Sequence, residues 1–346
     1  MRTIDKVRSA SENSCFWSDG SQISGSTGMD KPDHDNLRIF SGSASPALTA
    51  EICKLLHVEP ALCETRQFSE GNTFVRVLEN VRGRDTYIIQ TLSDPVNDHF
   101  MELLFWIDAL RRASAMAVTA VIPFFSYAKG DKKDEPRVSI RARVCADCLE
   151  AAGADRVLTM DLHAPQIQGF FRIAVDHLYA LPVLAERFGE HVTDDWVIVA
   201  PDVGFGEQAR RFGRALGIEY VVSEKTRTGH DESAKVLRII GDVRGKTCLM
   251  VDDFATSGGT LIATADKLLE NGATEVYAAV SHGVLPGAAP NRIQASAIKR
   301  LVITDTLEAR QDPLPDKIEV ASVAPLFARA IHNIHHRTSV SQLFDF

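Results

Sequence analysis

The segment Val251–Thr260 contains side chains and glycines of the kinds that bind a sugar phosphate. Asp252 and Asp253 can accept hydrogen bonds from neighbouring sugar hydroxyls, and paired glycines allow a ligand to approach the backbone closely. A helix that begins at the glycines would offer unpaired N–H groups to a phosphate. An ordinary turn is the alternative, but a turn does not require two adjacent carboxylates. We therefore predict a sugar-phosphate site made of Asp252, Asp253, Thr256, Ser257, Gly258, Gly259 and Thr260.

Short apolar runs alternate with amphipathic segments from residue 37 onward. Val197–Ala200 and Cys248–Val251 are continuously apolar, which is typical of strands buried on both faces of a parallel sheet. The predicted strands are Leu37–Ser41, Thr86–Gln90, Val118–Pro123, Arg156–Asp161, Trp196–Ala200, Tyr220–Val222, Thr247–Asp252, Glu275–Val280 and Leu301–Thr304. The predicted helices are Met101–Ala113, Ile140–Ala152, Glu207–Leu216, Gly259–Asn271 and Ala324–His335. This order predicts an α/β fold in which ligands bind at the carboxyl ends of the strands.

The length of 346 residues exceeds that of one typical domain. The two halves also resemble each other, because Ala151–Val157 and Glu270–Val276 both lead from the end of a helix into a strand. We predict an N-terminal domain over residues 37–180 and a C-terminal domain over residues 181–346. Residues 1–36 are rich in Ser, Gly and Asp, which predicts a flexible extension.

The composition excludes several classes of function. The chain has 38 Lys and Arg against 46 Asp and Glu, a net charge of −8, which argues against sequence-independent nucleic-acid binding but not against small anionic ligands. The most apolar stretch, Ala115–Phe125, is interrupted by Thr119 and Pro123 and is too short to span a membrane. Six scattered cysteines are not a disulfide scaffold and favour a reducing, cytoplasmic compartment.

The Val251–Thr260 segment resembles the PRPP-binding motif shared by type I phosphoribosyltransferases and PRPP synthetases. Two further segments favour the synthetases: Thr159–Phe171 resembles their histidine-containing loop, and Pro123–Ala128 resembles their nucleotide-binding segment. The similarity continues from about residue 37 to Phe346 and includes Phe68–Gly71, Asn97–Leu104 and Ser339–Phe344. On these motifs the chain is identified as a member of the ribose-phosphate pyrophosphokinase family.

The resemblance implies a reaction and a fold. Mg²⁺-ATP and ribose 5-phosphate would give PRPP and AMP, by attack of the anomeric hydroxyl of the sugar on the β-phosphorus. The fold would consist of two tandem type I phosphoribosyltransferase-like domains, each a mainly parallel sheet flanked by helices. The resemblance also implies a homo-oligomer, commonly a hexamer, in which a neighbouring subunit donates the loop that contains Phe68.

The resemblance assigns roles to matching positions outside the sugar-phosphate loop. His163 and Asp202 would bind Mg²⁺, although magnesium prefers oxygen ligands, so Asp202 and water would supply most of the coordination. Lys225 and Arg227 alternate along an extended segment and would stabilise charge on the transferring phosphates. The implied ATP-binding residues are Phe68, Glu70, Asn72, Lys129, Gly130 and Asp131.

The chain departs from the common synthetase pattern at the nucleotide site. Lys129-Gly130 replaces the usual Arg-Gln pair, and Asn72 replaces an acidic residue. These changes suggest a weakly active regulatory paralogue of a synthetase as one alternative. A phosphoribosyltransferase is a second alternative, although it would share only the sugar-phosphate loop. Thr256, where an aspartate is commoner, is a substitution that the transferases also show.

Overall fold

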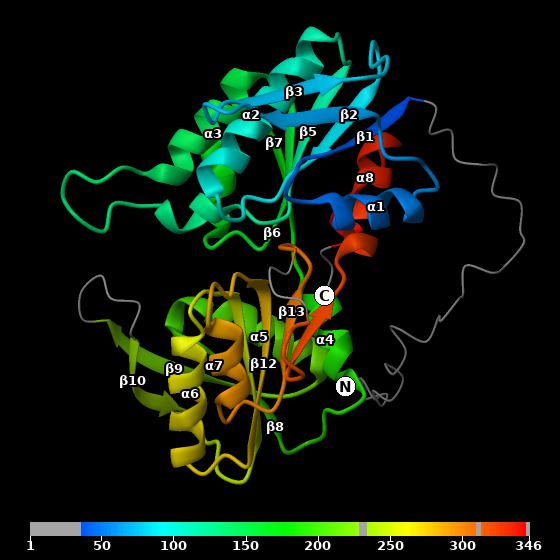
Figure 1. The fold of residues 1–346 in the computed structure, drawn as a ribbon. Coiled ribbons are helices and arrows are strands. Elements are labelled where there is room, and N and C mark those ends of the chain that lie inside the picture. Colours follow the sequence, from blue (N-terminus) through cyan, green and yellow to red (C-terminus); the bar gives the residue numbers. More distant parts are fainter. Residues whose placement is uncertain (1–35, 228–233, 309–312, 344–346) are drawn as a thin grey trace, which may run out of the picture. The chain divides into compact units, whose positions relative to one another are not determined.

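The computed structural model describes residues 36–227, 234–308 and 313–343 (Figure 1). The predicted flexible extension, except for Asn36, lies outside the described residues. From Asn36 onward the chain forms one compact unit. The strands within it assemble into two larger sheets and one separate pair of strands.

The first sheet is entirely parallel, and its neighbours follow the order of the chain. All but the first residue of each central strand is buried, and most of these buried residues are apolar, which explains why the strands were recognisable in the sequence. The strands are, in spatial order, β1 (Leu37–Ser41), β4 (Asp85–Ile89), β5 (Ala117–Ile122), β6 (Arg156–Met160) and β7 (Ala174–Leu178). The helices of this half are α1 (Pro46–Leu55), α2 (Val96–Arg112) and α3 (Arg141–Ala152).

The second sheet is parallel except at one edge, where β10 runs antiparallel to β9. Its strands are, in spatial order, β10 (Ala234–Ile240), β9 (Tyr220–Arg227), β8 (Trp196–Ala200), β11 (Thr247–Ala255), β12 (Glu275–Gly283), β13 (Leu301–Thr304) and β14 (Ile318–Ala321). The remaining helices are α4 (Leu181–Gly189), α5 (Gly206–Leu216), α6 (Gly259–Glu270), α7 (Ala289–Ala295) and α8 (Ala324–His335). Left-handed glycines close α3 and α5, at Gly153 and Gly217.

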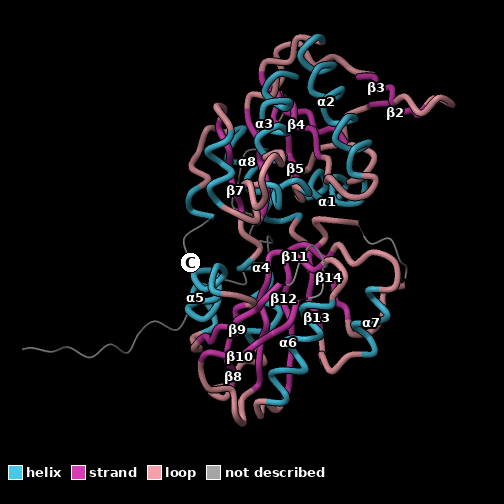
Figure 2. The backbone as a smooth tube through the Cα atoms, turned by 90° about the vertical axis from the view of Figure 1, so that its left-hand side faces the viewer, coloured by secondary structure: helices cyan, strands magenta, loops and turns pink. Residues whose placement is uncertain are grey.

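A hairpin of β2 (Cys63–Gln67) and β3 (Thr73–Val77) stands apart from both sheets, and Figure 2 shows it projecting from the first half. The sequence prediction missed this hairpin because β2 is polar and has no buried face to produce an apolar run. It also missed β7, β10, β14, α1, α4 and α7, most of which are too short or too exposed to show a clear period.

The last helix, α8, packs against α1 of the first half (Figure 1). Ile52 of α1 and Phe327 of α8 belong to one buried apolar cluster, and Nδ1 of His335 lies 2.9 Å from Oδ2 of Asp85. The C-terminal end of the chain therefore stabilises the first sheet as well as the second. The division into domains at residue 180 stays a prediction, because the chain from Asn36 onward is one compact unit.

The α/β prediction, with two mainly parallel sheets flanked by helices, is confirmed. Every predicted strand and helix is present, and the largest differences in length are at β9 and α2, each of which is five residues or so longer at one end. Among the described residues, no helix is both long and apolar enough to cross a membrane.

Candidate active site

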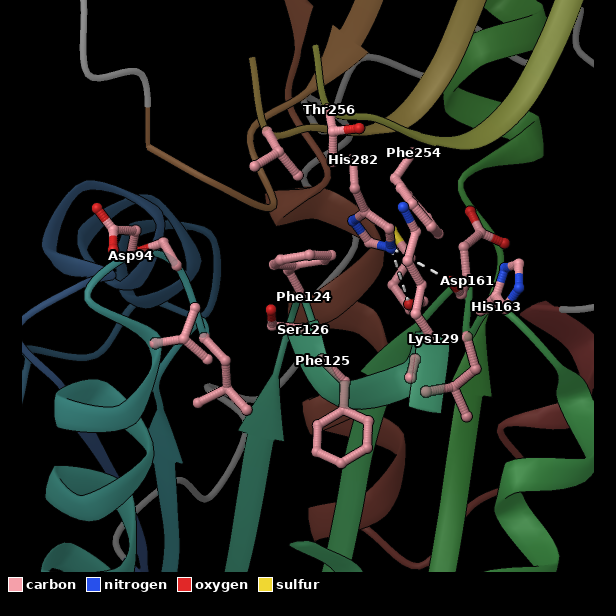
Figure 3. Close-up of a pocket in the computed structure, with 17 residues that line it drawn as sticks. Asp94, Phe124, Phe125, Ser126, Lys129, Asp161, His163, Phe254, Thr256 and His282 are labelled. Carbon is pink, nitrogen blue, oxygen red and sulfur yellow. Dashed lines mark hydrogen bonds between the residues drawn. The ribbon is translucent and has the colours of Figure 1, made fainter. Parts of the chain in front are cut away.

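A small cavity lies where the carboxyl ends of strands from both sheets face each other (Figure 3). It has a volume of about 130 Å³. Phe124, Lys129 and His163 of the first half line it, together with Phe254 and Thr256 of the second half. Residues from the predicted ATP, metal and sugar-phosphate groups therefore meet around one cavity, as expected for an open α/β sheet.

The sugar-phosphate loop has the backbone geometry of an anion site. Strand β11 continues through Asp252 and Asp253 to Ala255, and α6 begins at Gly259. Gly258 precedes the helix in the left-handed conformation, with φ of 74°. A Cβ atom at Gly258 would lie 2.9 Å from Cδ1 of the buried Ile293, so both the dihedral angle and the packing require glycine.

Replacing Gly258 with alanine should weaken binding of the predicted sugar phosphate about tenfold and lower the free energy of unfolding by about 1–2 kcal/mol, since the substitution strains the loop. Gly259→Ala is the matched comparison, because its Cβ would meet only Oγ of Ser257 at 3.5 Å and its φ is not left-handed. Gly259→Ala should leave the stability unchanged in urea titrations. Equal stability losses in the two variants would contradict the role of the Gly258 backbone.

Asp253 joins the predicted sugar site directly to the predicted metal site. Its Oδ2 atom lies 2.7 Å from Nδ1 of His163, and its Oδ1 atom accepts a hydrogen bond from the Phe254 N–H at 2.8 Å. The Asp253 side chain is 12% exposed, whereas the His163 side chain is 41% exposed. The hydrogen bond that the His163 imidazole donates to Asp253 raises the pKa of His163 above its ordinary value. The sequence did not predict this contact, which joins residues 90 positions apart.

The predicted ATP-binding residues fall into two groups. Lys129 and Gly130 end a 3-10 helix, Ser126–Gly130, beside the cavity, and Asp131 follows them. Phe68, Glu70 and Asn72 lie in the exposed turn between β2 and β3 and do not line the cavity. The arrangement of Phe68 with a neighbouring subunit stays a prediction.

Packing explains the unusual Gly130. It is buried, and a Cβ atom there would lie 2.5 Å from Nε and 2.8 Å from Cβ of Arg141, the first residue of α3. A larger residue at position 130 would require Arg141 to move. The packing against Arg141 therefore accounts for Gly130. This glycine gives less support to the alternative of a weakly active paralogue.

The two predicted metal ligands, His163 and Asp202, suit a cation that arrives bound to a nucleotide. Asp202 is exposed and caps a short 3-10 helix, where its side chain accepts the Phe205 N–H at 3.1 Å. Within the part of the chain that the structure describes, no three His, Cys, Asp or Glu side chains are grouped to hold a metal ion. Magnesium commonly binds through one or two protein ligands together with substrate phosphates, so a sparse donor set fits a magnesium–nucleotide complex.

Lys225 and Arg227 lie at the end of β9, and their backbones pair with Val236 and Ala234 of β10. The backbone here is extended, as the sequence predicted, but it is part of a hairpin rather than of a free loop. The rest of the predicted catalytic loop, residues 228–233, lies outside the described residues.

Comparison with known proteins covers nearly the whole compact unit. Residues 37–153 match the N-terminal domain of ribose phosphate pyrophosphokinase, and residues 198–345 match the phosphoribosyl synthetase-associated domain. The chain is 47% identical over 311 residues to the ribose-phosphate pyrophosphokinase of Caldanaerobacter subterraneus subsp. tengcongensis, across 90% of this chain and 98% of that protein. The chain belongs to the ribose-phosphate pyrophosphokinase family.

Other members of the pyrophosphokinase family show the same full-length similarity. The Bacillus subtilis ribose-phosphate pyrophosphokinase is 44% identical over 310 residues, 90% of this chain and 98% of that protein. The crystal structure of phosphoribosylpyrophosphate synthetase from Mycobacterium smegmatis superposes with a TM-score of 0.82 at 39% identity, across 87% of this chain and 99% of that one. The predicted family, fold and enzyme class are therefore confirmed, and the phosphoribosyltransferase alternative is not favoured.

A buried polar cluster in the wall of the cavity of this pyrophosphokinase was not predicted from the sequence. Nε2 of His282 lies 3.2 Å from the Met160 carbonyl and 3.3 Å from the Asp161 carbonyl, and its Nδ1 lies 2.9 Å from Oγ1 of Thr306. The hydroxyl of Ser281 donates to Asp161, whose pKa burial raises to about 6. These bonds connect β12 of the second half to the end of β6, which leads to His163. A single histidine inside a strand carries no sequence signal of such a role.

Proposed function

We propose that the chain transfers the β,γ-diphosphate of Mg²⁺-ATP to the anomeric hydroxyl of ribose 5-phosphate, giving PRPP and AMP. The observation that supports this proposal is the contact between the proposed metal ligand His163 and the proposed sugar ligand Asp253, in which Nδ1 lies 2.7 Å from Oδ2. The hydroxyl oxygen attacks the β-phosphorus, the bond from that phosphorus to the α,β-bridging oxygen breaks, AMP leaves with that oxygen, and the hydroxyl proton passes to solvent.

Each of the predicted binding segments would contact a different part of the substrates. Asp252 and Asp253 would hold the sugar hydroxyls, and the loop from Thr256 to Thr260 would hold the 5-phosphate at the start of α6. Lys129 and Asp131, together with the Phe68 loop of a neighbouring subunit, would hold ATP, and Lys225 and Arg227 would stabilise the transferring phosphates. Mg²⁺ bound by His163 and Asp202 would neutralise charge on the ATP phosphates. Such a reaction depends on positioning and electrostatics more than on covalent help from the protein.

The proposed function also includes an oligomeric state and a cellular location. The chain would form a homo-oligomer, which the family resemblance suggests is a hexamer. A second copy in this oligomer would supply the Phe68 loop. A cytoplasmic location is supported by Cys53, Cys63, Cys145, Cys148 and Cys248, which are free thiols.

The test uses the full chain, Mg²⁺, ribose 5-phosphate and ATP labelled at the β-phosphorus. We expect equal amounts of AMP and PRPP, with the label in PRPP. Formation of ADP in place of AMP, or release of label as free diphosphate, would overturn the proposal. A chain that forms neither product alone but increases the activity of a relative in a mixed assembly would support the regulatory alternative instead.

A further inference from the structure

The ring of Phe254 lies between two side chains of the opposite half (Figure 3). Nζ of Lys129 lies 3.7 Å from the centroid of the ring. The imidazole of His163 contacts the same ring edge-on, with centroids 5.5 Å apart and planes inclined by 61°. Phe254 is half-buried, and it belongs to β11, whereas Lys129 and His163 follow β5 and β6.

The geometry with Lys129 is that of a cation over an aromatic face. The face of a phenyl ring is negative, so it attracts an ammonium group that lies within about 6 Å of the centroid. Lys129 is exposed and its side chain is a flexible four-carbon stem, so contact with the ring restricts where the ammonium lies. The ring therefore favours those rotamers of Lys129 that place the charge against Phe254, beside the cavity that both residues line.

Asp253 and Phe254 act on the first half as a pair. Asp253 accepts from the imidazole of His163, and the next residue supports both that imidazole and the Lys129 ammonium. The Phe254 N–H in turn donates to Oδ1 of Asp253 at 2.8 Å. This bond restricts the orientation of the Asp253 carboxylate relative to Phe254. A single strand end of the sugar-binding half thus orients two groups of the nucleotide-binding half.

We propose that Phe254 is a positioning residue for ATP, which holds the Lys129 ammonium and the His163 imidazole in place for the phosphates. This inference rests on the proposed function, in that Lys129 and His163 are taken to face the nucleotide. It adds a residue from the sugar side of the site to the determinants of ATP affinity.

The test replaces Phe254 with 4-fluoro-, 3,5-difluoro- and pentafluorophenylalanine in the full chain. Fluorine draws electrons from the ring while nearly preserving its shape, so the attraction for the ammonium weakens stepwise. We expect the KM and the calorimetric Kd for ATP to rise with each step, by about two- to fivefold in total for an exposed cation. The KM for ribose 5-phosphate and kcat should change by less than about twofold, a split that general damage to the fold would not produce.

Phe188 provides the matched control, because Arg300 lies over its ring at 5.3 Å in a buried position outside the site. The same fluorinated residues at position 188 should leave the affinity for ATP unchanged. With Lys129→Met as background, fluorination of Phe254 should affect the affinity for ATP less than in the unmodified chain, since only the contact of the ring with His163 remains.

Constant ATP affinity across the Phe254 series would overturn the inference, and so would a steady gain in affinity, which would show that the ring holds the lysine away from ATP. Both results leave the proposed function intact if the unmodified chain forms AMP and PRPP. If the unmodified chain binds ATP but forms no PRPP, the proposed function fails, and the calorimetric series still decides the role of Phe254.

Discussion

Replacing His163 with alanine should lower kcat/KM for AMP formation by about 100- to 1000-fold, the usual loss when one preorganised group is removed from a polar active site. His163 is the residue at which the two halves of the site meet. The substitution removes both the 2.7 Å bond to Asp253 and the edge contact with Phe254. It also removes the side chain that we propose to contact the metal on the ATP phosphates.

The His163 variant should still fold, with a free energy of unfolding lowered by about 1–3 kcal/mol, because the substitution leaves the largely buried Asp253 carboxylate without this hydrogen bond. The measurement is steady-state AMP formation at several Mg²⁺ concentrations, together with urea unfolding. His191→Ala, at an exposed histidine outside the site, is the control and should retain full activity. An active His163→Ala enzyme would remove that residue from the mechanism.

Asp253→Asn refines this test. The amide keeps the size of the side chain but loses the carboxylate that accepts the hydrogen bond from Nδ1 of His163. We expect an intermediate loss of activity, with a larger effect on the KM for ribose 5-phosphate than His163→Ala produces. An Asp253→Asn enzyme whose KM for the sugar is unchanged would argue against Asp253 as a sugar ligand.

Replacing the buried His282 with leucine should lower the free energy of unfolding by about 2–4 kcal/mol at pH 8, because it leaves buried polar partners without their hydrogen bonds. Nε2 faces two carbonyl oxygens, so the neutral imidazole carries its proton there, and the Thr306 hydroxyl donates to Nδ1. A leucine can replace neither bond. The measurement is equilibrium unfolding in urea.

The pH dependence separates this role from simple packing. Burial lowers the pKa of His282 to about 4, whereas an unfolded chain binds the proton near pH 6.5. The unfolded state therefore holds the extra proton between these values, and the stability that the neutral His282 contributes is lost as the pH falls from 6.5 toward 4. The difference in stability between the unmodified chain and His282→Leu should shrink over this range, by at most about 1.4 kcal/mol per pH unit.

Thr306→Val is the control for the titration. It removes the hydroxyl partner of His282 but keeps the imidazole, so it should be less stable than the unmodified chain by a nearly constant amount across the same range. His177, whose pKa burial also lowers to about 4, and Asp161, whose raised pKa acts in the opposite direction, are present in all three proteins. A constant stability gap for His282→Leu would show that folding does not lower the pKa of this imidazole.

Much of this enzyme could be predicted from local patterns. Strands β8 and β11 were found because strands buried on both faces must be apolar throughout, and α6 was found because a glycine pair and a hydrophobic period mark its start and its length. The loop from Asp252 to Thr260 could be recognised for a similar reason, since its residues act together while adjacent in the chain. The hairpin of β2 and β3 was missed, because its polar strands gain little from burial.

Motifs of neighbouring residues were enough to recognise the family and the chemical type of each binding segment, and hydrophobic periods of two or 3.6 were enough to predict the two-sheet α/β architecture. The contacts between distant segments became known from the three-dimensional fold: His163 with Asp253, Lys129 with Phe254, and His282 with the end of β6. These pairs are separated by 90 or more positions and are set by how the strand ends of one half approach those of the other. Their energies depend on burial and on distances of a few ångströms, and neither can be obtained from the order of residues along the chain.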